Sequence, residues 1–167
     1  LIEVDIGEGV TTIKTSAFEK NTIEKLTLPS SIERLHWYAF YDNNITELSW
    51  TDGGTADAWI EEYVFQKNSL IKFTIPSNVT EIADGAFADN NLILVTFLGN
   101  RPGGDGDSIG DPMLKGSMSY GAFLNNPELS SIFYCESPQD GWPGERIRVK
   151  SPNGDIPGIN ILPKSDC

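Results

Sequence analysis

Apolar residues recur along this chain in triplets whose last two members are two positions apart. The triplets are Leu1, Val4 and Ile6; Ile23, Leu26 and Leu28; Ile45, Leu48 and Trp50; Leu70, Phe73 and Ile75; Leu92, Val95 and Phe97; and Leu129, Ile132 and Tyr134. Side chains two apart on a strand point to the same face, so each triplet predicts a short strand with one buried face. Further apolar sets follow some of these strands: Val10, Ile13 and Phe18; Ile32, Leu35 and Phe40; and Val79, Ile82 and Phe87. They predict a second short strand and a phenylalanine-containing turn in each unit.

A pentapeptide that ends in asparagine closes five of these units, as AFEKN, AFYDN, VFQKN, AFADN and AFLNN. The asparagines lie 22, 25, 22 and 36 residues apart, which describes a 22-residue unit with insertions of 3 and 14 residues. A repeat of about 20 to 29 residues is typical of solenoids of the leucine-rich class. The sequence therefore predicts a mainly β fold in which about six short coils stack over residues 1–134.

The repeated asparagine has a structural explanation. The same turn recurs in every coil of a solenoid, so its backbone donors and acceptors lie against neighbouring coils and need partners. An asparagine side chain both donates and accepts hydrogen bonds, and asparagine tolerates left-handed backbone geometry. We therefore expect a structural ladder above the core phenylalanines, formed by Asn21, Asn43, Asn68, Asn90 and Asn126.

Two stretches carry a resemblance to a known family: LIKFTIPSNVTEIADGAFADN at residues 70–90 and, more loosely, IEKLTLPSSIERLHWYAFYDN at residues 23–43. They resemble the BspA-like leucine-rich repeats of bacterial cell-surface proteins, whose pattern runs through an apolar strand, Ile-Pro, a Val-Thr-x-Ile strand and an Ala-Phe turn. The resemblance implies a right-handed solenoid, extracellular and secreted or held at the cell surface, that serves adhesion or protein binding. Three features depart from that pattern: Glu8 and Gly9 replace the proline turn, and insertions occupy Thr51–Asp57 and Gly99–Gly116.

The two ends of the chain differ in composition. Residues 135–167 are rich in proline and glycine and contain both cysteines at their limits, Cys135 and Cys167. We expect them to form a C-terminal cap stapled by a disulfide, which stabilises by about 3 to 4 kcal/mol in the chain-entropy model. Two unpaired thiols are the alternative. At the other end, Leu1 enters at the first apolar position of a coil, so we expect this uncapped repeat to meet a preceding domain or to support self-association.

Charge and composition exclude several classes of function. The 12 basic and 24 acidic residues give a net charge of −12 without a Lys/Arg cluster, so nucleic acid is not an expected partner. No apolar run approaches the ~20 residues that span a bilayer, so membrane insertion is not expected. With one histidine and no CxxC motif, zinc is not an expected ligand. No nucleophile motif or phosphate loop is present and a solenoid offers flat faces rather than a pocket, so we expect no enzyme.

Aromatic residues gather around two neighbouring turns and form the candidate binding patch. Its members are His36, Trp37, Tyr38, Trp59 and Tyr63, and Tyr41 follows the first of these turns. Since Phe40 and Phe65 already fill the core positions, several of these rings are expected at the surface, where exposed ring faces mark sugar or protein contacts. The alternative is that the rings pack beneath the insertion at Thr51–Asp57.

Two further surface features have competing explanations. Asp105, Asp107 and Asp111 lie among glycines in the longer insertion, so this loop is a candidate calcium site, and the alternative is a solvated loop without metal. Along the outer face of the first strands, Glu3, Lys25, Glu47 and Lys72 alternate in sign, which favours register and solubility rather than binding.

The expected function is therefore a non-enzymatic extracellular module for protein binding or adhesion, without a resident cofactor unless calcium is bound. Its partner is expected to be a protein or a surface glycan. Two alternatives remain open. One is a self-assembling structural subunit of a surface filament or layer, and the other is a carbohydrate-binding accessory domain of a larger secreted enzyme.

Overall fold

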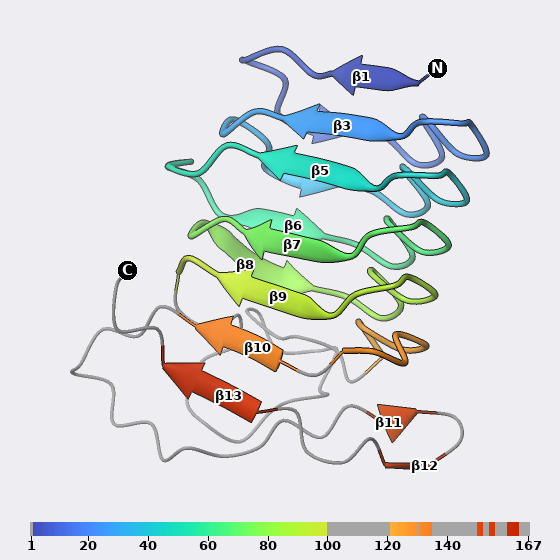
Figure 1. Cartoon of the computed structure of the whole chain (residues 1–167). Helices are drawn as coiled ribbons and strands as arrows, with labels where there is room; N and C mark the ends of the chain where they lie inside the picture. The colour runs from blue at the N-terminus through green and yellow to red at the C-terminus, as the bar shows by residue number, and fades with distance from the viewer. Residues whose placement is uncertain are drawn as a thin grey trace.

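The computed structural model describes residues 2–99, 121–129, 131–134, 150–151, 154–155 and 160–163. These residues form thirteen short strands and no helix. Figure 1 shows the strands stacked one above another in chain order, as a solenoid requires. The predicted mainly β solenoid is confirmed.

Each complete coil contributes one strand to a front layer and one to a back layer. The front strands are β1 (Glu3–Asp5), β3 (Lys25–Leu28), β5 (Glu47–Trp50), β7 (Lys72–Ile75), β9 (Leu94–Phe97), β10 (Ser131–Tyr134) and β13 (Asn160–Pro163). The back strands are β2 (Thr12–Ile13), β4 (Arg34–Leu35), β6 (Ala58–Ile60) and β8 (Val79–Ile82). Four coils thus have both strands among the described residues, and β13 adds a further parallel strand beside β10. The strands β11 (Lys150–Ser151) and β12 (Gly154–Asp155) form a separate antiparallel pair.

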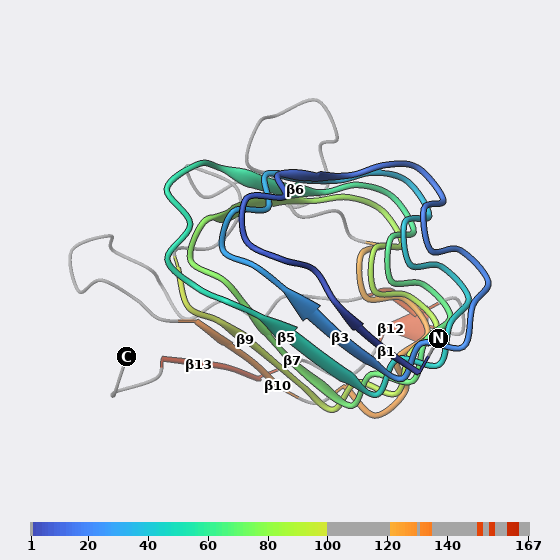
Figure 2. The same ribbon diagram turned by 90° about the horizontal axis from the view of Figure 1, so that it is seen from above.

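The core lies between the two layers, inside the closed outline of the coils that Figure 2 shows end on. Alternation along each strand turns the apolar triplets inward, so that Leu26, Leu28 and Ile75 are at most 1 % exposed. One phenylalanine from each coil adds a continuous column of rings through this core. Neighbouring centroids of Phe18, Phe40, Phe65, Phe87 and Phe123 lie 5.1, 5.6, 5.2 and 5.4 Å apart.

Four asparagines of the pentapeptide bind the turn of the preceding coil. Ile45 N donates to Asn68 Oδ1 at 3.0 Å, and Asn68 Nδ2 donates to Phe40 O at 3.0 Å and to Phe65 O at 3.1 Å. Asn43, Asn90 and Asn126 repeat this arrangement one coil earlier or later. Asn21 differs, because it is exposed and its printed bond runs to Glu19 O of its own turn at 3.2 Å. The ladder thus has four rungs, of which Asn68, Asn90 and Asn126 are buried and Asn43 is partly buried. No turn that precedes Asn21 is among the described residues.

The residue before each ladder asparagine has a left-handed backbone. These residues are Lys20, Asp42, Lys67, Asp89 and Asn125, with φ between 53° and 56°. A left-handed residue turns the chain sharply and is tolerated best by residues with short polar side chains or by glycine. The turn geometry is therefore a property of the repeat rather than of any single coil.

The front layer is interrupted between β5 and β7. The strands β1, β3 and β5 form one parallel sheet and β7, β9, β10 and β13 form another, whereas β2, β4, β6 and β8 pair without interruption behind them. We call the interruption the sheet break. In the first sheet Glu3 pairs with Lys25, and Lys25 pairs with Glu47, with 3.0 Å between Lys25 Nζ and Glu47 Oε2. Glu47 and Lys72 lie on opposite sides of the sheet break, so the expected pair between them does not form.

Two features of the sequence lie at the sheet break. The insertion at Thr51–Asp57 follows β5 directly. In the back layer the pairing of β6 with β8 shifts between Ala58 and Trp59, and the extra residue is Thr80 of β8. Pro76 follows β7 at the position where neighbouring coils donate a backbone hydrogen bond, from Thr51 N to Leu28 O at 2.9 Å and from Leu98 N to Ile75 O at 3.0 Å. Proline has no N–H, so the equivalent bond from β7 to Trp50 O does not form.

Several predicted features fall outside the described residues. They are Leu1, the acidic loop with Asp105, Asp107 and Asp111, and both cysteines, so the disulfide-stapled cap stays a prediction. The shorter insertion is described and is anchored to the next coil. Asp52 Oδ1 accepts hydrogen bonds from Ser77 N and Ser77 Oγ, both at 2.7 Å.

Candidate functional site

Two tyrosines at the same position of neighbouring coils form the centre of the candidate site. Tyr38 and Tyr63 follow the back strands β4 and β6, and their rings stack with centroids 5.2 Å apart and planes inclined by 19°. Tyr41 meets the edge of Tyr38, with centroids 5.4 Å apart. Together with Trp37, which is 52 % exposed, these residues form what we call the aromatic corner.

The backbone of both tyrosines is left-handed. Tyr38 has φ 59° and Tyr63 has φ 63°, whereas the equivalent residues of the flanking coils, Ser16 and Gly85, have φ 57° and 64°. A bulky residue in this region is an outlier, while glycine and small polar residues enter it more readily. The repeat therefore imposes a left-handed turn at this position, and two coils carry a large ring there despite the strain.

The flanking small residues determine which ring faces are open. A Cβ on Gly85 would overlap the Tyr63 ring, so this glycine gives the ring its place against the fourth coil. On the other side of the stack the first coil has Ser16, whose side chain is too short to cover Tyr38. Tyr38 is 36 % exposed as a result.

A polar network centred on Glu61 binds the backbone of Trp37. Glu61 Oε2 lies 2.9 Å from His36 Nδ1 and accepts a hydrogen bond from Trp37 N at 3.2 Å, while Glu61 Oε1 lies 3.6 Å from Arg34 Nε. The Arg34 guanidinium in turn lies over the Trp59 ring, 4.2 Å from its centroid. His36 and Trp59 are thus partly buried partners of this network, and Trp37, Tyr38 and Tyr63 are the members of the predicted patch that present rings outward.

Carboxylates surround the corner. Partial burial raises the pKa of the Tyr63 hydroxyl, and the charge of Asp84 raises it further, as do Tyr38 and Glu62. Burial also raises the pKa of Glu81, with Glu62 and Glu61 adding to this effect and Arg34 opposing it. On the other flank, the Lys67 ammonium lies 5.3 Å from the Tyr41 ring centroid, and its contacts with Tyr41 raise the pKa of Lys67.

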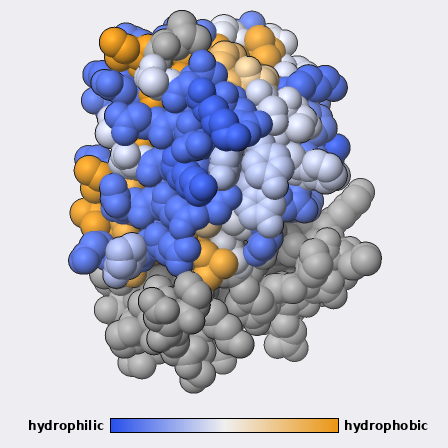
Figure 3. Space-filling view, turned by 90° about the vertical axis from the view of Figure 1, so that its right-hand side faces the viewer, coloured by the Kyte–Doolittle hydropathy of each residue, from blue (hydrophilic) through white to orange (hydrophobic). Residues whose placement is uncertain are grey.

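The rings do not pack beneath the insertion at Thr51–Asp57. That insertion joins β5 to β6 at one end of the coil, whereas Tyr38 and Tyr63 follow the back strands at the opposite end. Figure 3 faces the end of the molecule that carries these turns. It shows a mainly hydrophilic surface that includes pale residues of intermediate hydropathy.

Tyr41 and Lys67 belong to this site although the predicted patch omitted them. Their position three residues after Tyr38 and four after Tyr63 in the same turn is the signal that places them there.

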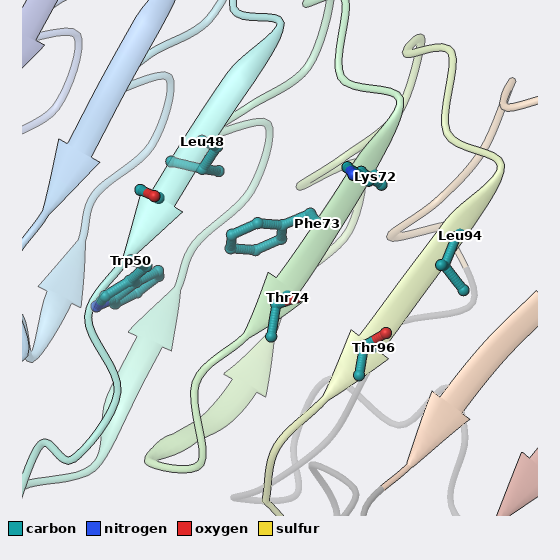
Figure 4. Close-up of a pocket in the computed structure, with 8 residues that line it drawn as sticks. Leu48, Trp50, Lys72, Phe73, Thr74, Leu94 and Thr96 are labelled. Carbon is teal, nitrogen blue, oxygen red and sulfur yellow. The ribbon is translucent and has the colours of Figure 1, made fainter. Parts of the chain in front are cut away.

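A cavity opens at the sheet break, some distance along the front layer. It has a volume of about 310 Å³ and is lined by Leu48, Trp50 and Phe73, and Figure 4 shows the Phe73 ring directed from β7 toward β5. Ser49, Lys72 and Thr74 also line it, and it extends over β7 to Leu94 and Thr96 of β9. The front layer is therefore hollowed rather than flat at this place.

No group of three metal-ligating side chains occurs within the part of the chain that the structure describes. The candidate calcium ligands lie outside that part and stay untested. Among the same described residues, no helix has the length and apolar character that crossing a bilayer requires.

Comparisons with known proteins agree with this architecture. The model of the BspA type leucine rich repeat region matches residues 1–101 in six copies. A crystal structure of a leucine-rich repeat protein from Eubacterium ventriosum is similar, with a TM-score of 0.60 and 19 % sequence identity over 89 % of this chain. This likeness shows the fold alone, and the chain spans 35 % of the length of that protein. No curated protein matches the sequence.

The repeat model covers more than half of the chain, and the parallel coils with their asparagine-bound turns supply the structure that such repeats require. The chain therefore belongs to the BspA-type leucine-rich repeat family.

Proposed function

We propose that this domain is a protein-binding module whose contact surface is the aromatic corner. The observation that carries the proposal is the left-handed backbone of Tyr38 and Tyr63, with φ 59° and 63°. A residue held in a sparsely populated backbone region costs about 1 to 3 kcal/mol and tends to occur where function requires it. Two such residues in adjacent coils, with stacked and partly exposed rings, support a binding role for this surface.

The chemistry of the corner suits a protein partner. Tyrosine and tryptophan are the residues most enriched among the energetic anchors of protein interfaces, because they offer large rigid contact areas and a polar tip. Trp37 and Tyr38 provide such areas, and Glu61 fixes the Trp37 backbone through a 3.2 Å hydrogen bond. A surface that is already ordered loses little conformational entropy when a partner binds.

The proposed role is non-catalytic. The histidine ring at His36 lies against Glu61 at 2.9 Å, so it supports Trp37 rather than facing a substrate. Family membership supports a general role in protein binding or adhesion. An extracellular or cell-surface location follows from the resemblance to bacterial surface repeats and belongs to this proposal.

Binding to arrays of purified surface proteins and of glycans, measured by surface plasmon resonance, tests the proposal. For any protein that binds the parent domain, the double variant Trp37→Ala/Tyr38→Asn should bind about thirtyfold more weakly, which corresponds to about 2 kcal/mol. The control variant Thr27→Ala changes an outward position of the front layer away from both sites and should bind as the parent does.

Three results would contradict this proposal. Binding that the double variant retains would remove the aromatic corner as the contact surface. Binding to glycans alone would favour the carbohydrate-binding alternative. Concentration-dependent self-association without any other partner, measured by sedimentation, would favour the structural subunit.

A further inference from the structure

We propose that the sheet break is a second binding site, which takes one apolar side chain of an extended peptide together with its flanking main-chain amides. This site is separate from the aromatic corner. It lies in the front layer between β5 and β7, whereas the corner follows the back strands.

The break leaves one apolar side chain of the front layer, Leu48, more exposed than its equivalents. In the neighbouring front strands, the residues equivalent to Leu48 are Leu26, Phe73 and Val95, and they are only 1, 3 and 0 % exposed. Leu48 itself is half-buried and lines the cavity with Trp50 and Phe73. Figure 4 shows the Phe73 ring directed from β7 toward β5, where Leu48 lies, and Trp50 at the end of β5. An apolar group that entered here would complete the packing that a paired strand provides elsewhere.

The break also leaves main-chain groups without the ladder that satisfies them in the other coils. The bonds from Thr51 N to Leu28 O and from Leu98 N to Ile75 O have no counterpart at Trp50 O, because Pro76 stands at the donor position. Backbone groups at a strand edge without a partner can bind an amide, which both donates and accepts hydrogen bonds. Main-chain recognition therefore favours a peptide over other small molecules.

The size of the cavity limits what enters it. A volume of about 310 Å³ lies at the lower end of the range of about 300 to 1,000 Å³ for ligand pockets. This volume accommodates one large side chain rather than a complete inserted strand. Ser49 and Thr74 are among the lining residues, and their hydroxyl groups are suited to bind the amides on either side of that side chain.

The indole of Trp50 argues against a saccharide and provides a reporter. Sugars stack on open aromatic faces, but Trp50 is 8 % exposed and contributes little of its ring surface. Its Nε1–H is buried without a hydrogen-bond partner among the described residues, and Figure 4 shows this nitrogen on the side away from Phe73. The resonance of this N–H is therefore sensitive to repacking of the cavity, and a Trp50→Phe variant assigns it.

The test titrates the whole chain with N-acetyl-L-phenylalaninamide and N-acetyl-L-leucinamide and follows the Trp50 indole N–H by nuclear magnetic resonance. A saturable shift is expected with a Kd of about 1 mM, as befits ligands of this size. Ser49→Trp places a ring at the opening and should weaken binding at least about tenfold. The matched control is Thr27→Trp, because Thr27 pairs in register with Ser49 where the ladder is intact, and it should bind as the parent does.

Several outcomes would overturn the inference. They are the absence of a saturable shift, equal binding by Ser49→Trp, binding of benzene as tight as that of the amides, and binding of cellobiose alone. Thr74→Trp blocks the opening from β7 and replaces Ser49→Trp if that variant does not fold. Tyr38→Asn should leave the titration unchanged, so failure at this site is distinguishable from failure of the aromatic corner.

Discussion

The ladder asparagines and the corner tyrosines occupy the same turn of the repeat, yet they have different roles. Asn43, Asn68, Asn90 and Asn126 point inward and bind the preceding turn in the same way in each coil. Tyr38 and Tyr63 point outward and occur in two coils, where the flanking coils have Ser16 and Gly85. A position that every coil fills alike serves the scaffold, whereas a position that one or two coils fill differently is available for binding.

The largest effect is expected when a buried rung is removed. Asn68→Ala deprives Ile45 N and Phe40 O of their partner inside the core, so the free energy of unfolding should fall by about 3 kcal/mol. Asn21→Ala is the matched control, since Asn21 is exposed, and it should cost less than about 0.5 kcal/mol. Urea denaturation of both variants measures the difference. Equal losses would show that the buried bonds do not distinguish the rungs.

A smaller loss is expected at the insertion that the third coil alone carries. Asp52→Ala removes two hydrogen bonds to Ser77 at an exposed site, which should lower the free energy of unfolding by about 1 kcal/mol at pH 7. The hydroxyl and the N–H of Ser77 lower the pKa of Asp52 in the folded state. The stabilisation is therefore complete above the unfolded pKa of about 4 and is lost as the pH falls through the folded pKa. A difference between parent and variant that persists at the most acidic pH would contradict this.

Replacement of a corner tyrosine should hardly change stability. Tyr38→Asn loses the stack on Tyr63 but relieves the left-handed backbone, which asparagine tolerates, so the two effects should cancel to within about 1 kcal/mol. Tyr41→Asn is the control, because Tyr41 is not among the left-handed residues, and it should destabilise more. Thermal unfolding measures the stability of both variants. A greater loss of stability in Tyr38→Asn would mean that Tyr38 serves the scaffold.

The smallest effect is expected at Glu81, beside the corner. Burial raises the pKa of Glu81 in the folded state, so its charged form destabilises the fold. The penalty is complete above the folded pKa and disappears below the unfolded pKa of about 4. Glu81→Gln should therefore raise the free energy of unfolding at pH 7 by about 0.5 kcal/mol or less and leave it unchanged near pH 3. A pH series of denaturation curves measures this, and destabilisation at pH 7 would reverse the assigned sign.

The scaffold could be predicted from the sequence because the same packing and hydrogen-bonding requirements recur in every coil. The spacing of Leu26 and Leu28 fixed a strand and its buried face, and the same spacing six times fixed the stacking of the coils. Asn68 was identifiable as structural because a buried turn must satisfy its own backbone. The sequence did not distinguish Asn21 from the other rungs. Its exposure depends on the contacts of the preceding turn rather than on the sequence of its own turn.

The sites were less predictable because each depends on a single coil. Trp37 and Tyr38 were recognisable as surplus aromatics beside Phe40, but their left-handed backbone and the network through Glu61 required the structure. The sheet break arises from Pro76 and the insertion after β5, and neither signal alone identifies a cavity. Pro29 stands at the equivalent position after β3, where β1 and β3 still pair, so proline by itself does not open the layer.

The ladder gives the solenoid a direction of growth. Each asparagine satisfies the turn that was completed one coil earlier, as Asn90 does for Phe65 O and Leu70 N. During synthesis from the N-terminus, a finished coil therefore waits for its successor before its turn is fully bonded, and the successor arrives with the asparagine already in place. If coils are lost from the C-terminal side, backbone groups in the turn of the new last coil lose their hydrogen-bond partners. If coils are lost from the N-terminal side, only the asparagine side chain of the new first coil loses its partners.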